Sequence, residues 1–166
     1  MNALLLIHVA LSLAGIGSGI VVLWGLLSGK RLDGWTGLFL ATTVATSVTG
    51  YGFPFHQLLP SHVVGGISLV VLAIAIFARY SRRLAGPWWA VYVICASLAL
   101  YLNVFVAVVQ AFLKVPALKA LAPTQKELPF LAAQSVVLLV FLGFTVLAAK
   151  RFRIEPLRAV SKRGAA

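Results

Sequence analysis

Three histidines are the residues of this 166-residue chain best suited to binding a metal or a redox cofactor: His8, His56 and His62. Neutral imidazole is the commonest protein ligand for zinc, copper and iron. Two axial histidines on different helices are also a common way for a membrane cytochrome to hold haem b. Glu127, one of only three acidic residues, adds a carboxylate as a further ligand for a divalent metal.

Each histidine also has an explanation that involves no ligand. His56 and His62 bracket a short connection, and lipid headgroups would wet them if that connection lies at the membrane surface. Their spacing, His56-x5-His62, matches no established ligand motif, so a shared site requires a tight turn. His8 lies inside an apolar segment, where a hydrogen bond to a neighbouring helix would satisfy it.

Amide and phenol side chains form the second group of candidates. Asn103, Gln110 and Gln134 would line a polar pocket for a quinone headgroup or another polar solute if their helices meet. Alternatively, these amides hydrogen bond across helix–helix contacts, as amides in membrane helices commonly do. Tyr51 stands between two glycines, which loosen the backbone and would let the ring turn toward such a site.

The sequence lacks the motifs of several large enzyme classes. It contains no P-loop, GxSxG or HExxH motif, and no pair of acidic residues within an apolar segment. A single cysteine, Cys95, excludes an intramolecular disulfide and any multi-cysteine metal or iron–sulfur site. We therefore expect a protein that is not an enzyme by itself.

The composition indicates that membrane helices must position these residues. The chain is 61% hydrophobic and 10% charged, whereas soluble domains carry about 25% charged residues. A hydrocarbon core about 30 Å thick requires about 20 apolar residues of helix. Five segments approach this length: residues 3–28, 35–55, 62–79, 88–113 and 129–149. Polar and apolar residues do not alternate within them, which argues against barrel strands. We therefore predict an all-α integral membrane bundle of five transmembrane helices over residues 1–152, with a basic cytoplasmic tail over residues 153–166.

The net charge of +11 is explained by topology. Of the 14 basic residues, eleven fall on one side of the predicted spans and three on the other, namely Lys114, Lys119 and Lys126. The positive-inside rule then places the N-terminus outside and the C-terminus in the cytoplasm, so the excess needs no nucleic-acid partner. Trp88 and Trp89 fall at the cytoplasmic interface, as aromatic belts do. All the candidate residues lie in the outer half, and the cytoplasmic half is predicted to hold no comparable polar groups.

Small residues and prolines predict further local structure. Gly15 and Gly19 form a GxxxG spacing, which favours a close crossing within the bundle or between protomers of a homo-oligomer. Gly65 and Gly66 in the third segment are candidates to receive that crossing. Between the fourth and fifth segments, two prolines frame residues 117–122, which we expect to form one or two turns of helix in the outer interface.

Several stretches of the chain resemble small bacterial inner-membrane proteins of uncharacterised activity. These stretches are residues 58–64 (LLPSHVV), 102–106 (LNVFV), 110–112 (QAF), 114–118 (KVPAL) and 121–125 (LAPTQ). The resemblance extends over most of the chain and implies a location in a bacterial inner membrane. It carries over no mechanism, but it draws attention to His62, Asn103 and Gln110.

Together these features predict a polar site at the outer face of the bundle. We expect it to bind haem b, a divalent metal or a quinone headgroup in a redox or metal-handling role. Its predicted metal ligands are His8, His56, His62 and Glu127, and its predicted cofactor-binding residues are His8, Tyr51, Asn103, Gln110 and Gln134. Two other functions stay open: a non-redox transport or channel component for small solutes, and a structural subunit of a larger membrane complex.

Overall fold

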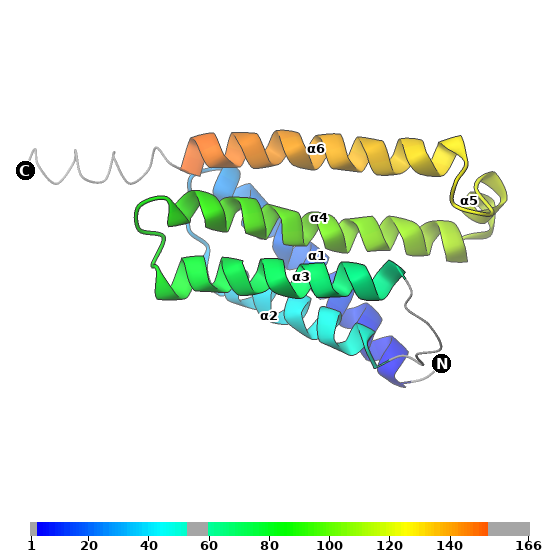
Figure 1. The fold of residues 1–166 in the computed structure, drawn as a ribbon, viewed down its shortest axis with the longest axis horizontal. Helices are drawn as coiled ribbons and strands as arrows, with labels where there is room; N and C mark the ends of the chain where they lie inside the picture. Colours follow the sequence, from blue (N-terminus) through cyan, green and yellow to red (C-terminus); the bar gives the residue numbers. More distant parts are fainter. Residues whose placement is uncertain (1–2, 53–59, 153–166) are drawn as a thin grey trace, which may run out of the picture.

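The computed structural model describes residues 3–52 and 60–152. Over these residues the chain is helical and contains no strand (Figure 1). The helices in chain order are α1 (Ala3–Leu27), α2 (Asp33–Gly50), α3 (Pro60–Ile76), the π-helical turn η1 (Phe77–Ser81), α4 (Trp88–Lys114), α5 (Pro116–Leu121) and α6 (Leu128–Phe152). The prediction of an all-α fold is confirmed.

Four stretches of helix are long and apolar enough to cross a membrane: α1, the continuous stretch from His62 to Ser81, α4 and α6. The remaining long helix, α2, has only 18 residues and begins at the charged Asp33. Most of its buried side chains carry hydroxyl groups, namely Thr36, Thr42, Thr43, Thr46 and Ser47. Four of the five predicted segments thus have the length and composition of membrane spans, and α2 is set apart by its polar buried face.

The long helices alternate in direction, so that their termini gather at two ends of the bundle (Figure 1). At one end the start of α1 meets the end of α2, where His8 Nδ1 lies 2.9 Å from Thr49 Oγ1. At the other end the start of α2 meets η1, which continues α3, through an ion pair between Asp33 and Arg79. We call these the His8 end and the Arg79 end. The His8 end corresponds to the side predicted to be outside.

The core lies among α1, α2, α3 and α4, whereas α6 lies at the edge of the bundle. The largest fully buried apolar side chains come from α2, α3 and α4 and include Phe39, Leu72, Tyr92 and Leu100. Few residues of α6 are buried, and most of its large apolar side chains are exposed. An apolar outward face of this kind suits contact with lipid.

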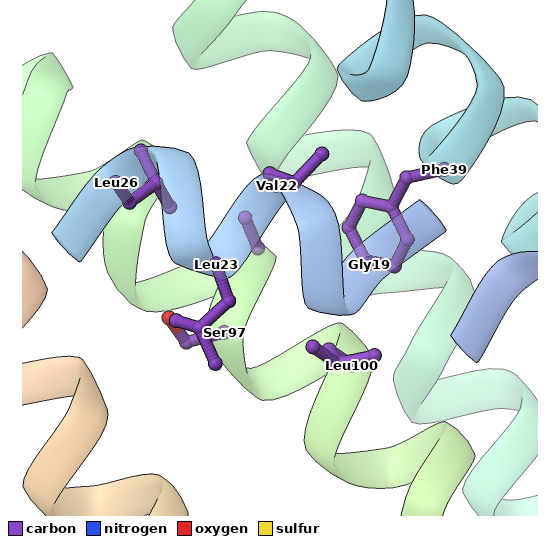
Figure 2. A pocket seen from close by; sticks show the side chains of 8 residues that line it. Gly19, Val22, Leu23, Leu26, Phe39, Ser97 and Leu100 are labelled. Carbon is purple, nitrogen blue, oxygen red and sulfur yellow. The ribbon is translucent and has the colours of Figure 1, made fainter. Parts of the chain in front are cut away.

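The crossing predicted at the GxxxG spacing occurs within the bundle, where α1 approaches α2 and α4. A Cβ atom added to Gly19 would lie 2.5 Å from Leu100 Cδ1 and 2.9 Å from the Phe39 ring. Figure 2 shows the side chains that surround Gly19, among them Phe39 and Leu100. The space between these side chains admits no water molecule. Only a residue without a side chain leaves room for these two neighbours.

Candidate functional site

A hydrogen bond anchors His8 to the last turn of α2. Its Nδ1 atom lies 2.9 Å from Thr49 Oγ1. The Thr49 hydroxyl donates its single proton to the Ala45 carbonyl oxygen at 2.8 Å, as threonines in helices commonly do. Thr49 must therefore accept the bond from His8. In the neutral ring, Nδ1 then carries the proton and Nε2 carries the lone pair.

Tyr51 and His62 form a second contact beside the first. The Tyr51 hydroxyl donates to the His62 carbonyl oxygen at 2.7 Å, and the centroids of the two rings are 5.6 Å apart. The Tyr51 side chain rests on Gly65 and Gly66. A Cβ added to Gly65 would lie 3.4 Å from the ring, and one added to Gly66 would lie 3.1 Å from the hydroxyl oxygen. These two glycines therefore receive Tyr51 and not α1. Because these glycines have no side chains, they leave room for the Tyr51 ring against α3.

The end of α2 thus gathers candidate residues from α1, α2 and α3. His8 is half-buried, and His62 is only 7% exposed, so His62 is not a headgroup-wetted surface residue. Tyr51 is 41% exposed, but its hydroxyl is held by α3. The third histidine, His56, lies outside the described residues. The structure therefore brings two of the predicted histidines, His8 and His62, into contact with the end of α2.

The predicted four-residue metal site finds no support in the part of the chain that the structure describes. Within residues 3–52 and 60–152, no three His, Cys, Asp or Glu side chains are close enough to share a metal ion. Glu127 instead stabilises the connection before α6. Its carboxylate accepts bonds from the Thr124 hydroxyl at 2.8 Å, from the Thr124 N–H at 3.1 Å and from the Lys126 N–H at 3.0 Å.

This arrangement makes the α5–α6 connection sensitive to acid. Partial desolvation acts to raise the pKa of Glu127, but the hydrogen bonds from Thr124 and Lys126 outweigh it and hold the pKa below its ordinary value of 4.5. The stabilisation is therefore fully present above pH 4.5 and is lost as the pH falls through the lowered pKa. We expect amide exchange at Thr124 and Lys126 to accelerate across that range, after correction for intrinsic rates. In the Glu127→Gln variant this acid-dependent step should be absent, and a step of unchanged size would contradict the assignment.

The three predicted amides lie at different levels of the bundle. Asn103 Nδ2 donates to Thr43 Oγ1 at 3.3 Å, which joins α4 to α2. Gln134 Nε2 donates to the Phe105 carbonyl oxygen at 3.2 Å, which joins α6 to α4. Gln110 is exposed. The two interhelical bonds agree with the packing interpretation, and a role for these amides in ligand binding stays a prediction.

The segment between α4 and α6 is held by a contact that we did not predict. α5 confirms the expected short helix between two prolines. After it, Gln125 Nε2 donates to the Val109 carbonyl oxygen at 2.9 Å, one turn of α4 from the carbonyl that Gln134 binds. A backbone acceptor leaves no pattern in the sequence, so spacing alone could not identify this pair.

The Arg79 end contains a polar cluster that we also did not predict. Arg79 lies in the π-helical turn η1, where its side chain is buried and paired with Asp33. The guanidinium carbon lies 5.1 Å from the centre of the Tyr92 ring, and the Tyr92 hydroxyl donates to Thr36 Oγ1 at 3.4 Å. The expectation that this half of the bundle holds no comparable polar groups is therefore wrong.

One feature of the sequence pointed to this cluster. Asp33 is the only acidic residue before Glu127, and it opens an apolar segment that follows two basic residues. A lone acidic residue at the edge of a membrane bundle requires a basic partner. Arg79 ends the third predicted segment, and the sequence does not indicate the π-helical turn in which its side chain is buried.

Comparison with protein-family models, with curated proteins and with solved structures found no match to this chain. The chemistry of its two polar ends therefore has to be inferred from their own residues.

Proposed function

We propose that this chain is a membrane haem protein, in which the lone pair of His8 Nε2 binds the iron of haem b at the His8 end. The observation that carries this proposal is the hydrogen bond between His8 Nδ1 and Thr49 Oγ1. A histidine that binds a metal ordinarily donates its other ring N–H to a protein acceptor, which fixes the tautomer and the ring orientation. His8 has this arrangement within an apolar helix, where ionisable side chains are costly and usually functional.

Haem suits the residues at this end better than a bare metal ion does. A protein site for a bare ion generally supplies three or four ligands, and the described residues offer no such group. A haem brings its own four nitrogen ligands and requires only one or two from the protein. His62 of α3, which contacts Tyr51, and His56 are the candidates for a second axial ligand.

A quinone headgroup suits the same end less well. Its carbonyl oxygens are acceptors, so a quinone site must supply N–H or O–H donors. The Tyr51 hydroxyl donates to the His62 carbonyl oxygen, and the His8 Nδ1–H donates to Thr49. The protons of the Tyr51 hydroxyl and of His8 Nδ1 are therefore both used in bonds within the protein. Haem iron requires no proton donor and binds instead to a lone pair of an imidazole nitrogen.

The test is the absorption spectrum and haem content of the purified full-length chain. We expect a Soret band from the wild-type protein, and we expect the substitution His8→Leu to abolish or strongly shift it. Lys119→Leu serves as the control because it removes an exposed polar side chain of α5 that is not among the predicted site residues. A folded wild-type protein that contains no haem and takes up none when titrated with haemin would overturn the proposal. Quinone or metal recovered from that sample would identify the alternative ligand.

The hydrogen bond to Thr49 leads to a more specific prediction. Thr49→Val keeps the shape of the side chain but removes the acceptor for His8 Nδ1–H. Loss of such a supporting hydrogen bond typically weakens metal affinity about 10–100-fold. We therefore expect weaker haem retention with His8 still present, measured by haem transfer to apomyoglobin. The control is Thr145→Val, since Thr145 bonds only to its own helix in the described structure. Equal retention in both variants would exclude the role assigned to Thr49.

We also propose that α2 is a fifth membrane crossing and that the N-terminus faces outward from a bacterial inner membrane. The alternating helix directions support this, and 18 residues of α-helix span about 27 Å. The distribution of basic residues supports the orientation. Reporters fused separately to the two termini distinguish the cases. Five crossings place the termini on opposite sides, whereas four place them on the same side.

A further inference from the structure

A groove between α4 and α6 lies at the Arg79 end, far along the bundle from His8 and His62. It has a volume of about 440 Å³ and is lined by Trp89 of α4 and by Val146, Ala149 and Lys150 of α6. Ala149 and Lys150 follow Val146 by three and four positions, so both lie one turn from it on the same side of that helix. Gly143 continues this face by one turn, and a Cβ added to it would meet no atom within 4 Å. The groove therefore has apolar walls, a lysine at one end and open space along the helix.

The groove lies in the most basic part of the molecule. The described basic residues of this end are Lys30, Arg31, Arg79, Arg82, Arg83, Lys150 and Arg151, and its described acidic residue is Asp33. Within residues 3–52 and 60–152, the one ion pair joins Asp33 to Arg79. Since that carboxylate is taken, Lys150 has no described acidic neighbour to neutralise it. The charge at the end of the groove therefore favours an anionic ligand.

We propose that this groove binds a phospholipid with a net negative headgroup. The lipid phosphate would lie at Lys150, and one acyl chain would follow Val146 and Gly143 into the membrane. Basic pockets between membrane helices are known to recognise anionic headgroups, because each lysine or arginine near the surface contributes favourable electrostatic energy. Trp89 suits the same depth, since its amphipathic ring prefers the boundary between headgroups and hydrocarbon. This proposal is independent of haem at the His8 end.

The test uses the purified full-length chain in a neutral detergent and native mass spectrometry of bound lipid. We expect phosphatidylglycerol to be retained in preference to phosphatidylcholine, because only the former carries a net charge. Lys150→Gln should reduce this preference about fivefold, the factor that corresponds to one basic residue near an anionic surface. Val146→Trp keeps every charge but fills the groove, and it should displace the lipid as well. Lys126→Gln, at the opposite end, removes one charge and should have no effect.

Three results would overturn the proposal. The first is equal retention of the two lipids by the wild type. The second is a loss with Lys150→Gln but not with Val146→Trp, which would assign the effect to surface charge without the groove. The third is displacement of the lipid by soluble glycerol phosphate at a similar concentration, which would make free phosphate the ligand. Helix content and thermal midpoint, measured for each variant, separate loss of lipid from loss of fold.

Discussion

Replacing Gly19 by alanine is expected to destabilise the bundle by about 1–3 kcal/mol. The new Cβ would lie 2.5 Å from Leu100 Cδ1 and 2.9 Å from the Phe39 ring, and both side chains are only 1% exposed. Neither can move outward, because each is enclosed by other helices. The space beside them admits no water molecule, so these two side chains must shift, at the cost usual for overpacking.

Gly17 provides a matched control on the same helix, because a Cβ added there would meet no atom within 4 Å. Gly17→Ala should be neutral or slightly stabilising, since alanine is the better helix former. Reversible unfolding in detergent micelles, followed by circular dichroism, measures both variants. If Gly19→Ala is as stable as Gly17→Ala, α1 does not cross α2 and α4 at Gly19.

The second large effect is expected at the opposite end, for Asp33→Asn. This change leaves the buried guanidinium of Arg79 with its charge but without its carboxylate. Hydrogen bonds to charged groups contribute about 1.5–3 kcal/mol, and we expect a loss in that range. Breaking a fully buried ion pair costs more, but the side chain of Asp33 is 81% exposed, so water can partly replace it.

A double variant separates the ion pair from general damage. Arg79→Met in the Asp33→Asn background removes the stranded charge, so the double variant should lose less stability than the two single losses added together. Arg82→Met is the control, because Arg82 is exposed and stacks at the edge of the same end over Trp88. Additive losses would show that the two side chains do not interact.

The positions of the helices were largely predictable, because backbone groups in lipid must bond within their own segment. Hydropathy therefore located the apolar helices, and the two prolines that frame it predicted the short helix α5. The burial of the polar face of α2 was less predictable. Two of its threonines donate to carbonyl oxygens one turn back in the same helix, Thr42 to Leu38 and Thr49 to Ala45. Hydropathy did not indicate that the same face is buried against three other helices.

The site was predictable only as a collection of residues near one end. The contact of His8 with Thr49 depends on the rotation of two helices about their axes, which weakly amphipathic helices do not specify. The seat of Tyr51 on Gly65 and Gly66 has the same origin. Lone histidines marked the end of the bundle at which chemistry is expected, but not the hydrogen bond that fixes which nitrogen is basic.

The π-helical turn at Phe77–Ser81 sets the direction in which Arg79 points, and therefore whether it can pair with Asp33 of α2. In this turn the Arg82 N–H bonds to the Phe77 carbonyl oxygen, five residues back, so the turn accommodates one residue more than an α-helix would. Each residue of an α-helix turns the chain by about 100°, so losing that extra residue would rotate Arg79 away from Asp33. Among evolutionary relatives, a deletion in this turn should therefore occur together with loss of the acidic residue at position 33. An alignment would show this as a gap within positions 77–81 that occurs together with a neutral residue at position 33, even where the rest of the helix has diverged.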